Sequence, residues 1–242
     1  MSAIVVRTAN PGHAAAWSAL LYVSQRMPRG WTIVGGQMVL LWCLERKSPL
    51  ARPTNDIDTV LDVRAHPDAH LRFTRLLAEQ GFRQHGETVS GRQHRWVRGE
   101  ALIDVLIPRY LGERADRRPG AAGGPALATP GGQHALDRTE SVAVVVDGQP
   151  GTVRRPNLVG ALIAKSATVE ILDDPARDRH LVDFLTLLTL LGPRDLMKVG
   201  TLEPLEASRL TRMSRNARLA AARLGMTNYE IQLDGLERLL AG

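Results

Sequence analysis

Apolar and polar positions along the chain follow the periods of helices and strands in turn. Helical spacing of apolar side chains predicts helices, and runs of β-branched residues predict strands. The helices predicted in this way cover 13–25, 37–46 and 67–80, and the strands cover 31–34, 56–63 and 101–108. Because these helices and strands alternate, we expect a sheet covered by helices.

A Gly/Pro/Ala-rich segment then divides the chain. Its composition, over 111–134, is typical of a mobile linker. A hairpin is predicted across the Asp147-Gly148 turn, and the later apolar patterns are helical. The fold class is therefore expected to be α+β, with a mixed-sheet core flanked by helices over 1–155 and a mainly helical part over 156–242.

The composition of the 242 residues is that of an ordinary globular protein, with 44% hydrophobic and 23% charged residues. A net charge of +6 fits either a polyanionic partner or a general richness in arginine. The single cysteine, Cys43, excludes an intramolecular disulfide and a cysteine-based zinc site. We recognise no secretory signal and no apolar run of the roughly 18–20 residues that a membrane span needs, so a cytoplasmic location is expected.

Two carboxylates lie close together in the strand predicted over 56–63. Asp56 and Asp58 are two residues apart, so they point to the same face of the strand and repel each other. They either cap a turn and meet solvent or hold a cation. Asp104 lies in the apolar stretch ALIDVLIP, where a lone carboxylate is costly unless it is paired or bound to metal.

A glycine pair offers a place for phosphate beside these carboxylates. Gly35 and Gly36 end one predicted strand and open the next helix, where backbone N–H groups and the helix dipole bind anions. Mg²⁺ binds through carboxylates together with substrate phosphates. Three aspartates near such a turn therefore predict two Mg²⁺ ions and a nucleotide.

These motifs resemble a known superfamily. The signature of the minimal nucleotidyltransferases is similar to three stretches of this chain, VGG, RPTNDIDTV and LIDVL. The AbiEii-type toxins are resembled more specifically by the Arg, Thr and DID of RPTNDID. The second signature of those toxins is matched by Lys165 and Ala167 in LIAKSA and by Asp183 in RHLVDFLTLL. The gap between the glycines and the DID motif is longer than in the superfamily, and His180 stands where the toxins carry an aspartate.

The resemblance implies an enzyme that transfers a nucleoside monophosphate from an NTP to an acceptor hydroxyl. The acceptor would be an RNA, most simply tRNA, and the setting a bacterial toxin–antitoxin pair with a cognate antitoxin protein. A small-molecule or protein acceptor on the same fold, or a catalytically dead nucleotide-binding module, are the alternatives.

The resemblance also assigns roles to individual residues. Asp56, Asp58 and Asp104 would hold Mg²⁺, and Asp104 would also help to deprotonate the acceptor. Phosphate binding would involve Gly35, Gly36, the N–H of Gln37, Arg52 and Lys165. Asp183 would orient Lys165 or an acceptor group, and Arg52 would either pair with the neighbouring aspartates or contact a phosphate.

A basic segment near the C-terminus has two interpretations. Its apolar seam at helical spacing comprises Leu210, Met213, Ala217, Ala220 and Leu224, and four arginines lie off that seam, at positions 209, 212, 215 and 218. These arginines are either a solvated helix face or contacts to an RNA backbone.

Overall fold

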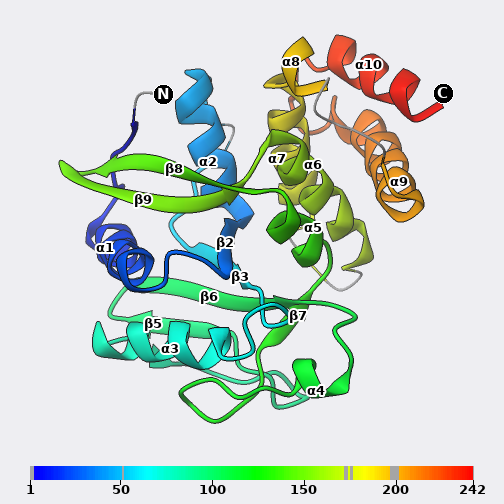
Figure 1. Cartoon of the computed structure of the whole chain (residues 1–242). Coiled ribbons are helices and arrows are strands. Elements are labelled where there is room, and N and C mark those ends of the chain that lie inside the picture. The colour runs from blue at the N-terminus through cyan, green and yellow to red at the C-terminus, as the bar shows by residue number, and fades with distance from the viewer. Residues whose placement is uncertain (1–2, 51, 172–173, 175–176, 197–201, 242) are drawn as a thin grey trace.

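The computed structural model describes residues 3–50, 52–171, 174, 177–196 and 202–241 (Figure 1). Its larger sheet has the strand order β2-β3-β6-β5-β4, with β7 beside β6. The strands are β2 (Trp31–Val34), β3 (Ile57–Leu61), β4 (Arg83–Gln84), β5 (Arg95–Arg98), β6 (Ala101–Pro108) and β7 (Leu127–Thr129). β3 and β6 run parallel, whereas β2 and β5 are antiparallel to their neighbours.

The smaller sheet has the order β1-β8-β9. Its strands are β1 (Ile4–Val6), β8 (Thr139–Val146) and β9 (Gln149–Pro156). The predicted hairpin is confirmed: β8 and β9 pair across Asp147 and Gly148, whose φ angles of 46° and 87° are those of a two-residue hairpin turn. The two sheets lie on either side of helix α1 (Figure 1).

Helix α1 (Pro11–Arg26) shows how local sequence sets an element in place. Asn10 accepts a hydrogen bond of 2.8 Å from the N–H of His13, and Pro11 occupies the first helical position. The apolar stripe of the helix, centred on Trp17 and Leu20, is fully buried between the sheets. Helices α2 (Gly35–Arg46) and α3 (Ala69–Glu79) also match the predicted ranges closely.

The chain after β9 is helical, as expected. It forms α6 (Leu158–Ser166), the 3₁₀ turn η1 (Ala167–Glu170), α7 (Asp178–Thr189), α8 (Pro193–Leu196), α9 (Pro204–Ala220) and α10 (Glu230–Ala241). Buried apolar side chains from both predicted parts of the chain, such as Trp17 and Phe184, belong to one cluster. The α+β fold class with a mixed sheet flanked by helices is confirmed.

The prediction of a linker over 111–134 is wrong for much of that segment. It contains α4 (Glu113–Asp116), β7 and the start of α5 (Gly132–Asp137), and β7 extends the larger sheet. A side chain at Gly120 would meet the His70 ring at 2.6 Å, and one at Gly124 would meet the Gln93 side chain at 2.4 Å. These two glycines therefore permit close packing of the chain rather than flexibility.

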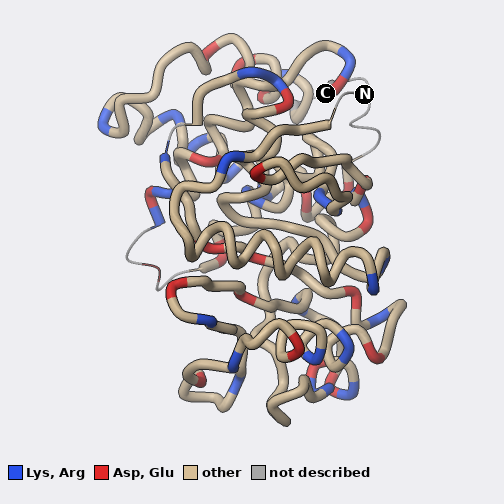
Figure 2. The backbone as a smooth tube through the Cα atoms, turned by 90° about the vertical axis from the view of Figure 1, so that its left-hand side faces the viewer, with Lys and Arg blue, Asp and Glu red and all other residues tan. Residues whose placement is uncertain are grey.

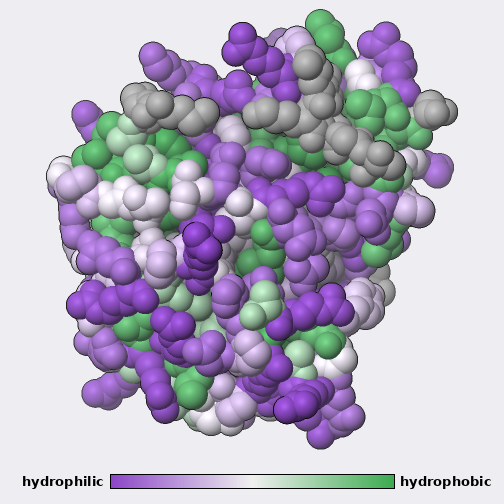
Figure 3. Space-filling view, viewed as in Figure 1, coloured by the Kyte–Doolittle hydropathy of each residue, from purple (hydrophilic) through white to green (hydrophobic). Residues whose placement is uncertain are grey.

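Along the backbone trace in Figure 2, basic and acidic residues are interspersed rather than segregated. Hydrophilic side chains also predominate on the face in Figure 3, with smaller hydrophobic areas between them. Within the described part of the chain, no helix combines the length and apolar character required to span a bilayer.

Candidate active site

The pairing of β3 with β6 brings two of the predicted carboxylates together. The strands are parallel, and Asp58 lies directly opposite Asp104. Adjacent strands are about 4.8 Å apart, so the two side chains are neighbours across the sheet. On the other side of β3, Asp58 lies opposite Val34, the last residue of β2. Asp56 lies just before β3, two residues from Asp58.

The glycine turn brings the start of α2 against these carboxylates. Gly35 has a φ of +64°, and a Cβ there would lie 1.7 Å from Oδ2 of Asp58. A Cβ at Gly36 would lie 2.4 Å from Oγ1 of Thr54. Only glycine allows the backbone to pass so close. The first turn of α2 has no side-chain cap, so its N–H groups stay available at the site.

The electrostatics of Asp58 favour the arrival of a cation. Burial, together with the charges of Asp56 and Asp104, raises the pKa of Asp58 to about 7, although Lys165 and Arg179 oppose this shift. A metal ion would replace the repulsion between the carboxylates with attraction.

Asp104 is paired, as its apolar strand requires. Arg95 of the adjacent strand β5 donates to both carboxylate oxygens, at 3.1 and 3.0 Å. The Asp104 side chain is only 10% exposed, while that of Arg95 is 41% exposed. The sequence did not indicate Arg95 as its partner.

Lys165 belongs to a buried three-residue ion network. Its Nζ lies 2.6 Å from Oδ2 of Asp183, and its side chain is 5% exposed, so it does not extend to the surface. Arg52 donates to the same carboxylate from Nε at 2.8 Å and from Nη2 at 2.7 Å. Burial acts to raise the pKa of Asp183, but the two cations outweigh it and hold the pKa below its usual range. Arg52 thus reaches across the fold to Asp183 rather than pairing with the aspartates beside it in sequence.

A cavity of about 550 Å³ joins these groups. Seven of the predicted residues line this cavity: Gly35, Gly36, Arg52, Asp56, Asp58, Asp104 and Lys165. Asp183 lies behind this wall. The side chain of Gln37 is fully buried and donates to the backbone oxygen of Thr54 at 2.9 Å, so only its backbone N–H fits the predicted role.

Sequence reasoning missed several polar residues of the cavity. His94, Arg95, Arg109, Arg179 and His180 all line it. The Nε2 atom of His180 lies 2.9 Å from Oδ2 of Asp174. Burial, with the nearby charges of Lys165 and Arg179, lowers the pKa of His180 to about 4, so this ring is neutral at physiological pH. The only signal for His180 was its departure from the toxin signature.

The donor set fits Mg²⁺ bound jointly with a nucleotide. Among the described residues, no three His, Cys, Asp or Glu side chains form a group that could hold a metal ion. Mg²⁺ commonly binds through only one or two carboxylates and completes its shell with substrate phosphates and water. Asp56 and Asp58 beside the free N–H groups of α2 match that pattern.

The arginines of α9 do not form a uniform outer face. Arg209 is buried and donates to Glu170 at 2.6 Å, because Glu170 of η1 lies beneath it. Arg218 pairs with two carboxylates of α10, at 2.6 and 2.8 Å. Neither interpretation, a solvated helix face or an RNA contact, holds for the buried Arg209, while Arg212, Arg215 and Arg218 are exposed.

Neither a protein-family model nor a curated protein matches the sequence. Among solved structures, the crystal structure of an antigenic nucleotidyltransferase-like protein from Paracoccidioides brasiliensis is similar, with a TM-score of 0.52 and 14% sequence identity. The match covers 91% of this chain and 95% of that one. The chain has the nucleotidyltransferase fold.

Two structures of the antibiotic-resistance factor ANT(2'')-Ia are also similar to this nucleotidyltransferase fold. The solution structure has a TM-score of 0.45 and covers 87% of this chain and 96% of that one; the complex with adenylyl-2''-tobramycin has a TM-score of 0.46 and covers 82% and 97%. Both are 15% identical in sequence. The resemblance to AbiEii-type toxins stays a prediction from the motifs.

Proposed function

We propose that the protein transfers a nucleoside monophosphate from an NTP to an acceptor hydroxyl. The observation that carries the proposal is that Asp58 lies opposite Asp104 on parallel strands, with Asp56 two residues before Asp58, at the uncapped start of α2. Turn capping does not explain why these carboxylates lie together in a nucleotidyltransferase fold, whereas binding of a cation does.

Asp56 and Asp58 would hold Mg²⁺, which supplies charge neutralisation of the triphosphate and of the attacking oxygen. The N–H groups at the start of α2 bind the terminal phosphates. Lys165 adds a point charge toward the triphosphate, and Asp183 positions Lys165 through their 2.6 Å contact.

Asp104 can take part only if Arg95 releases it. Both carboxylate oxygens accept hydrogen bonds from that guanidinium, so they are not free for a metal ion or a proton while the pair is formed. The Arg95 side chain is exposed enough to turn toward solvent or toward a phosphate. We therefore assign Asp104 to the metal and proton-accepting role in a state in which Arg95 contacts the substrate.

For the acceptor we propose RNA, most simply tRNA, with a toxin role that a cognate antitoxin would restrain. This proposal is supported by the motif resemblance, the net charge of +6 and the exposed Arg212 and Arg215. The arginines and the lysine in the cavity wall suit a polyanionic acceptor better than a cationic drug.

A transfer assay tests the proposal. Purified protein is incubated with each α-labelled NTP, Mg²⁺ and bacterial tRNA, and the RNA is resolved on a denaturing gel. We expect label in RNA that is lost in Asp58→Asn and Lys165→Gln. The matched controls Asp68→Asn and Lys47→Gln, both at exposed positions outside the cavity, should retain transfer.

The outcomes separate the parts of the proposal. Label on protein or on a small molecule instead of RNA would overturn the acceptor and keep the reaction. Transfer that persists in Asp58→Asn would overturn the assigned site. An absence of NTP binding and of transfer to any acceptor would overturn the function.

A further inference from the structure

A second cavity, of about 160 Å³, lies at the other end of β2 from the candidate active site. Trp31 begins β2 at this cavity, and Val34 ends β2 at the first cavity. Three strand residues span about 10 Å. Helix α5 separates the two spaces, because Gly132 lines the first and Leu136 lines the second. The second cavity is thus a distinct site.

Two arginines from separate elements meet at this cavity. Arg29 comes from the connection between α1 and β2, and Arg154 comes from β9. Neither forms an ion pair of 4 Å or less with a carboxylate among the described residues. Burial, and after it the charge of Arg29, lower the pKa of Arg154.

The guanidinium of Arg154 also has unused hydrogen-bonding capacity. Its Nε is buried and has no partner. Its Nη1 makes only long contacts, 3.4 Å to the backbone oxygen of Pro28 and 3.5 Å to Oγ of Ser141. A buried donor without an acceptor is costly, so a ligand that accepts hydrogen bonds would be favoured here.

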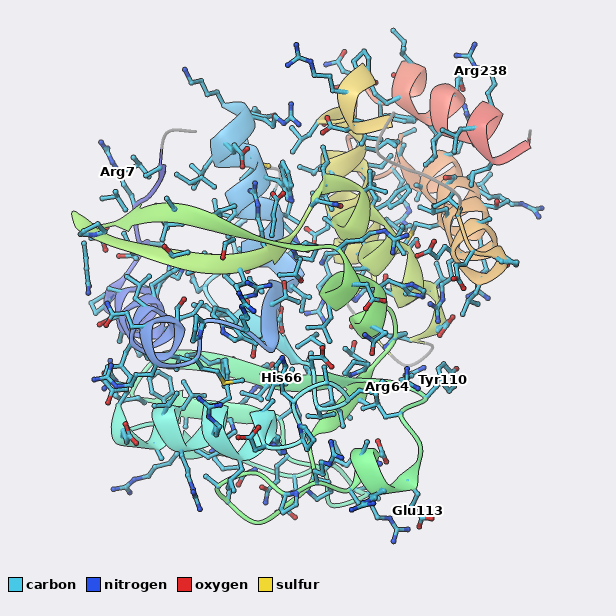
Figure 4. All side chains as sticks on the ribbon, in the orientation of Figure 1. Arg7, Arg64, His66, Tyr110, Glu113 and Arg238 are labelled. Carbon is cyan, nitrogen blue, oxygen red and sulfur yellow. The ribbon has the colours of Figure 1, made fainter. Side chains whose placement is uncertain are left out.

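A histidine completes the basic wall. His66 lies in the turn after β3 and is labelled in Figure 4. A Cβ at Gly30, where φ is +83°, would lie 2.8 Å from the His66 ring, so the glycine lets the ring pack against the backbone. The one carboxylate in the wall, Asp62, accepts a hydrogen bond at 2.9 Å from the N–H of Ala65 through Oδ1. Positive charge therefore exceeds negative charge around the cavity.

We propose that this cavity binds a phosphate group through Arg29, Arg154 and His66. A volume of 160 Å³ equals about five water molecules at liquid density, enough for one phosphate group but not for a whole nucleotide. The planar, multi-donor guanidinium suits tetrahedral oxyanions. The group belongs either to a nucleic-acid backbone or to free phosphate, which present the same oxygens. This site does not depend on the proposed transferase activity.

Thermal unfolding with inorganic phosphate, compared with chloride at equal ionic strength, tests the site. We expect phosphate to stabilise the parent protein and Lys165→Gln alike, since Lys165 belongs to the first cavity. Arg154→Gln and Arg29→Gln should each weaken phosphate binding by about tenfold or more, the usual effect of losing a charge-assisted hydrogen bond. The exposed Arg75→Gln on α3 is the matched control and should respond as the parent does.

The folding of the variants is controlled within the same experiment. Without phosphate, Arg154→Gln should unfold no lower than the parent, because the change removes an uncompensated charge. Three results would each overturn the proposal. Phosphate could fail to stabilise the parent protein, it could stabilise the Arg29 and Arg154 variants as much as the parent, or its effect could be lost in Lys165→Gln alone.

A second arm identifies the source of the phosphate. Binding of a fluorescent single-stranded RNA is measured for the parent and for Arg154→Gln, with inorganic phosphate as competitor. RNA binding that weakens in the variant and is competed by phosphate supports a backbone phosphate in this cavity. RNA binding that is unchanged, with phosphate stabilisation lost, supports a free phosphate group as the ligand.

Discussion

The contact between Gly35 and Asp58 allows a prediction that needs no knowledge of the substrate. Gly35→Ala places a methyl group 1.7 Å from Oδ2 of Asp58, at a residue with φ of +64°. The left-handed backbone alone costs an alanine about 1–2 kcal/mol. Displacing the carboxylate from its rotamer adds about 0.5–1.5 kcal/mol. We expect a total loss of about 1.5–3.5 kcal/mol in the free energy of unfolding.

Gly91→Ala provides the matched control. Gly91 has a φ of +70°, and a Cβ there would have no atom within 4 Å, so only the backbone term applies. Urea denaturation of both variants, at unchanged slope, measures the difference that the clash adds. Gly35→Ala should also abolish Mg²⁺-dependent nucleotide binding, which Gly91→Ala should retain. If both variants lost equal stability, the tight packing of Asp58 against the glycine would be refuted, whatever the substrate is.

Three further predictions concern the charges of the site. In EDTA at a pH above 7, Asp58→Asn should raise the unfolding temperature, because it removes a carboxylate whose pKa is raised to about 7. The same variant should lose the stabilisation that Mg²⁺ with NTP gives the parent protein. A lower unfolding temperature in EDTA would contradict this prediction. Asp183→Asn should lower the free energy of unfolding, measured by urea denaturation, by about 3–5 kcal/mol, because it leaves Lys165 and Arg52 without their buried carboxylate. A decrease below about 1 kcal/mol would refute the ion network. The pKa of His180 is lowered from 6.5 to about 4 in the folded protein, so the free energy of unfolding should fall by up to about 3 kcal/mol as the pH drops from 6.5 to 4. His180→Gln should flatten this pH profile of stability. An unchanged profile would contradict the assignment.

Local patterns in the sequence were sufficient for most elements. The helix over 37–46, the hairpin at Asp147 and the strand that carries Asp58 depend on periodicity and turn chemistry, which act over a few residues. The placement of Asp56 and Asp58 on one face follows from the same short period. The glycine turn was also visible, because a strand that runs straight into a helix needs a residue such as Gly35.

Long-range pairing could not be predicted in the same way. Arg95 meets Asp104 because β5 and β6 pair in one register, and a shift of one residue would have turned the arginine to the other face. Arg209 is buried because η1 places Glu170 beneath it, although its position off the apolar seam suggested solvent. The Gly-rich composition of 111–134 is compatible both with flexibility and with close backbone packing. Gly120 packs closely, and the composition alone could not distinguish the two.

The charges of the cavity are separated in a way that matches a metal–triphosphate complex. Asp56 and Asp58 form no ion pair within the described residues, so one wall carries uncompensated negative charge. Elsewhere in the cavity lining, Lys165 and Arg52 share the single carboxylate of Asp183, which leaves net positive charge. A cation alone would satisfy the first wall and a polyphosphate alone the second. A complex of the two would satisfy both, because the aspartates would hold the metal while the lysine and the first turn of α2 would bind the phosphates.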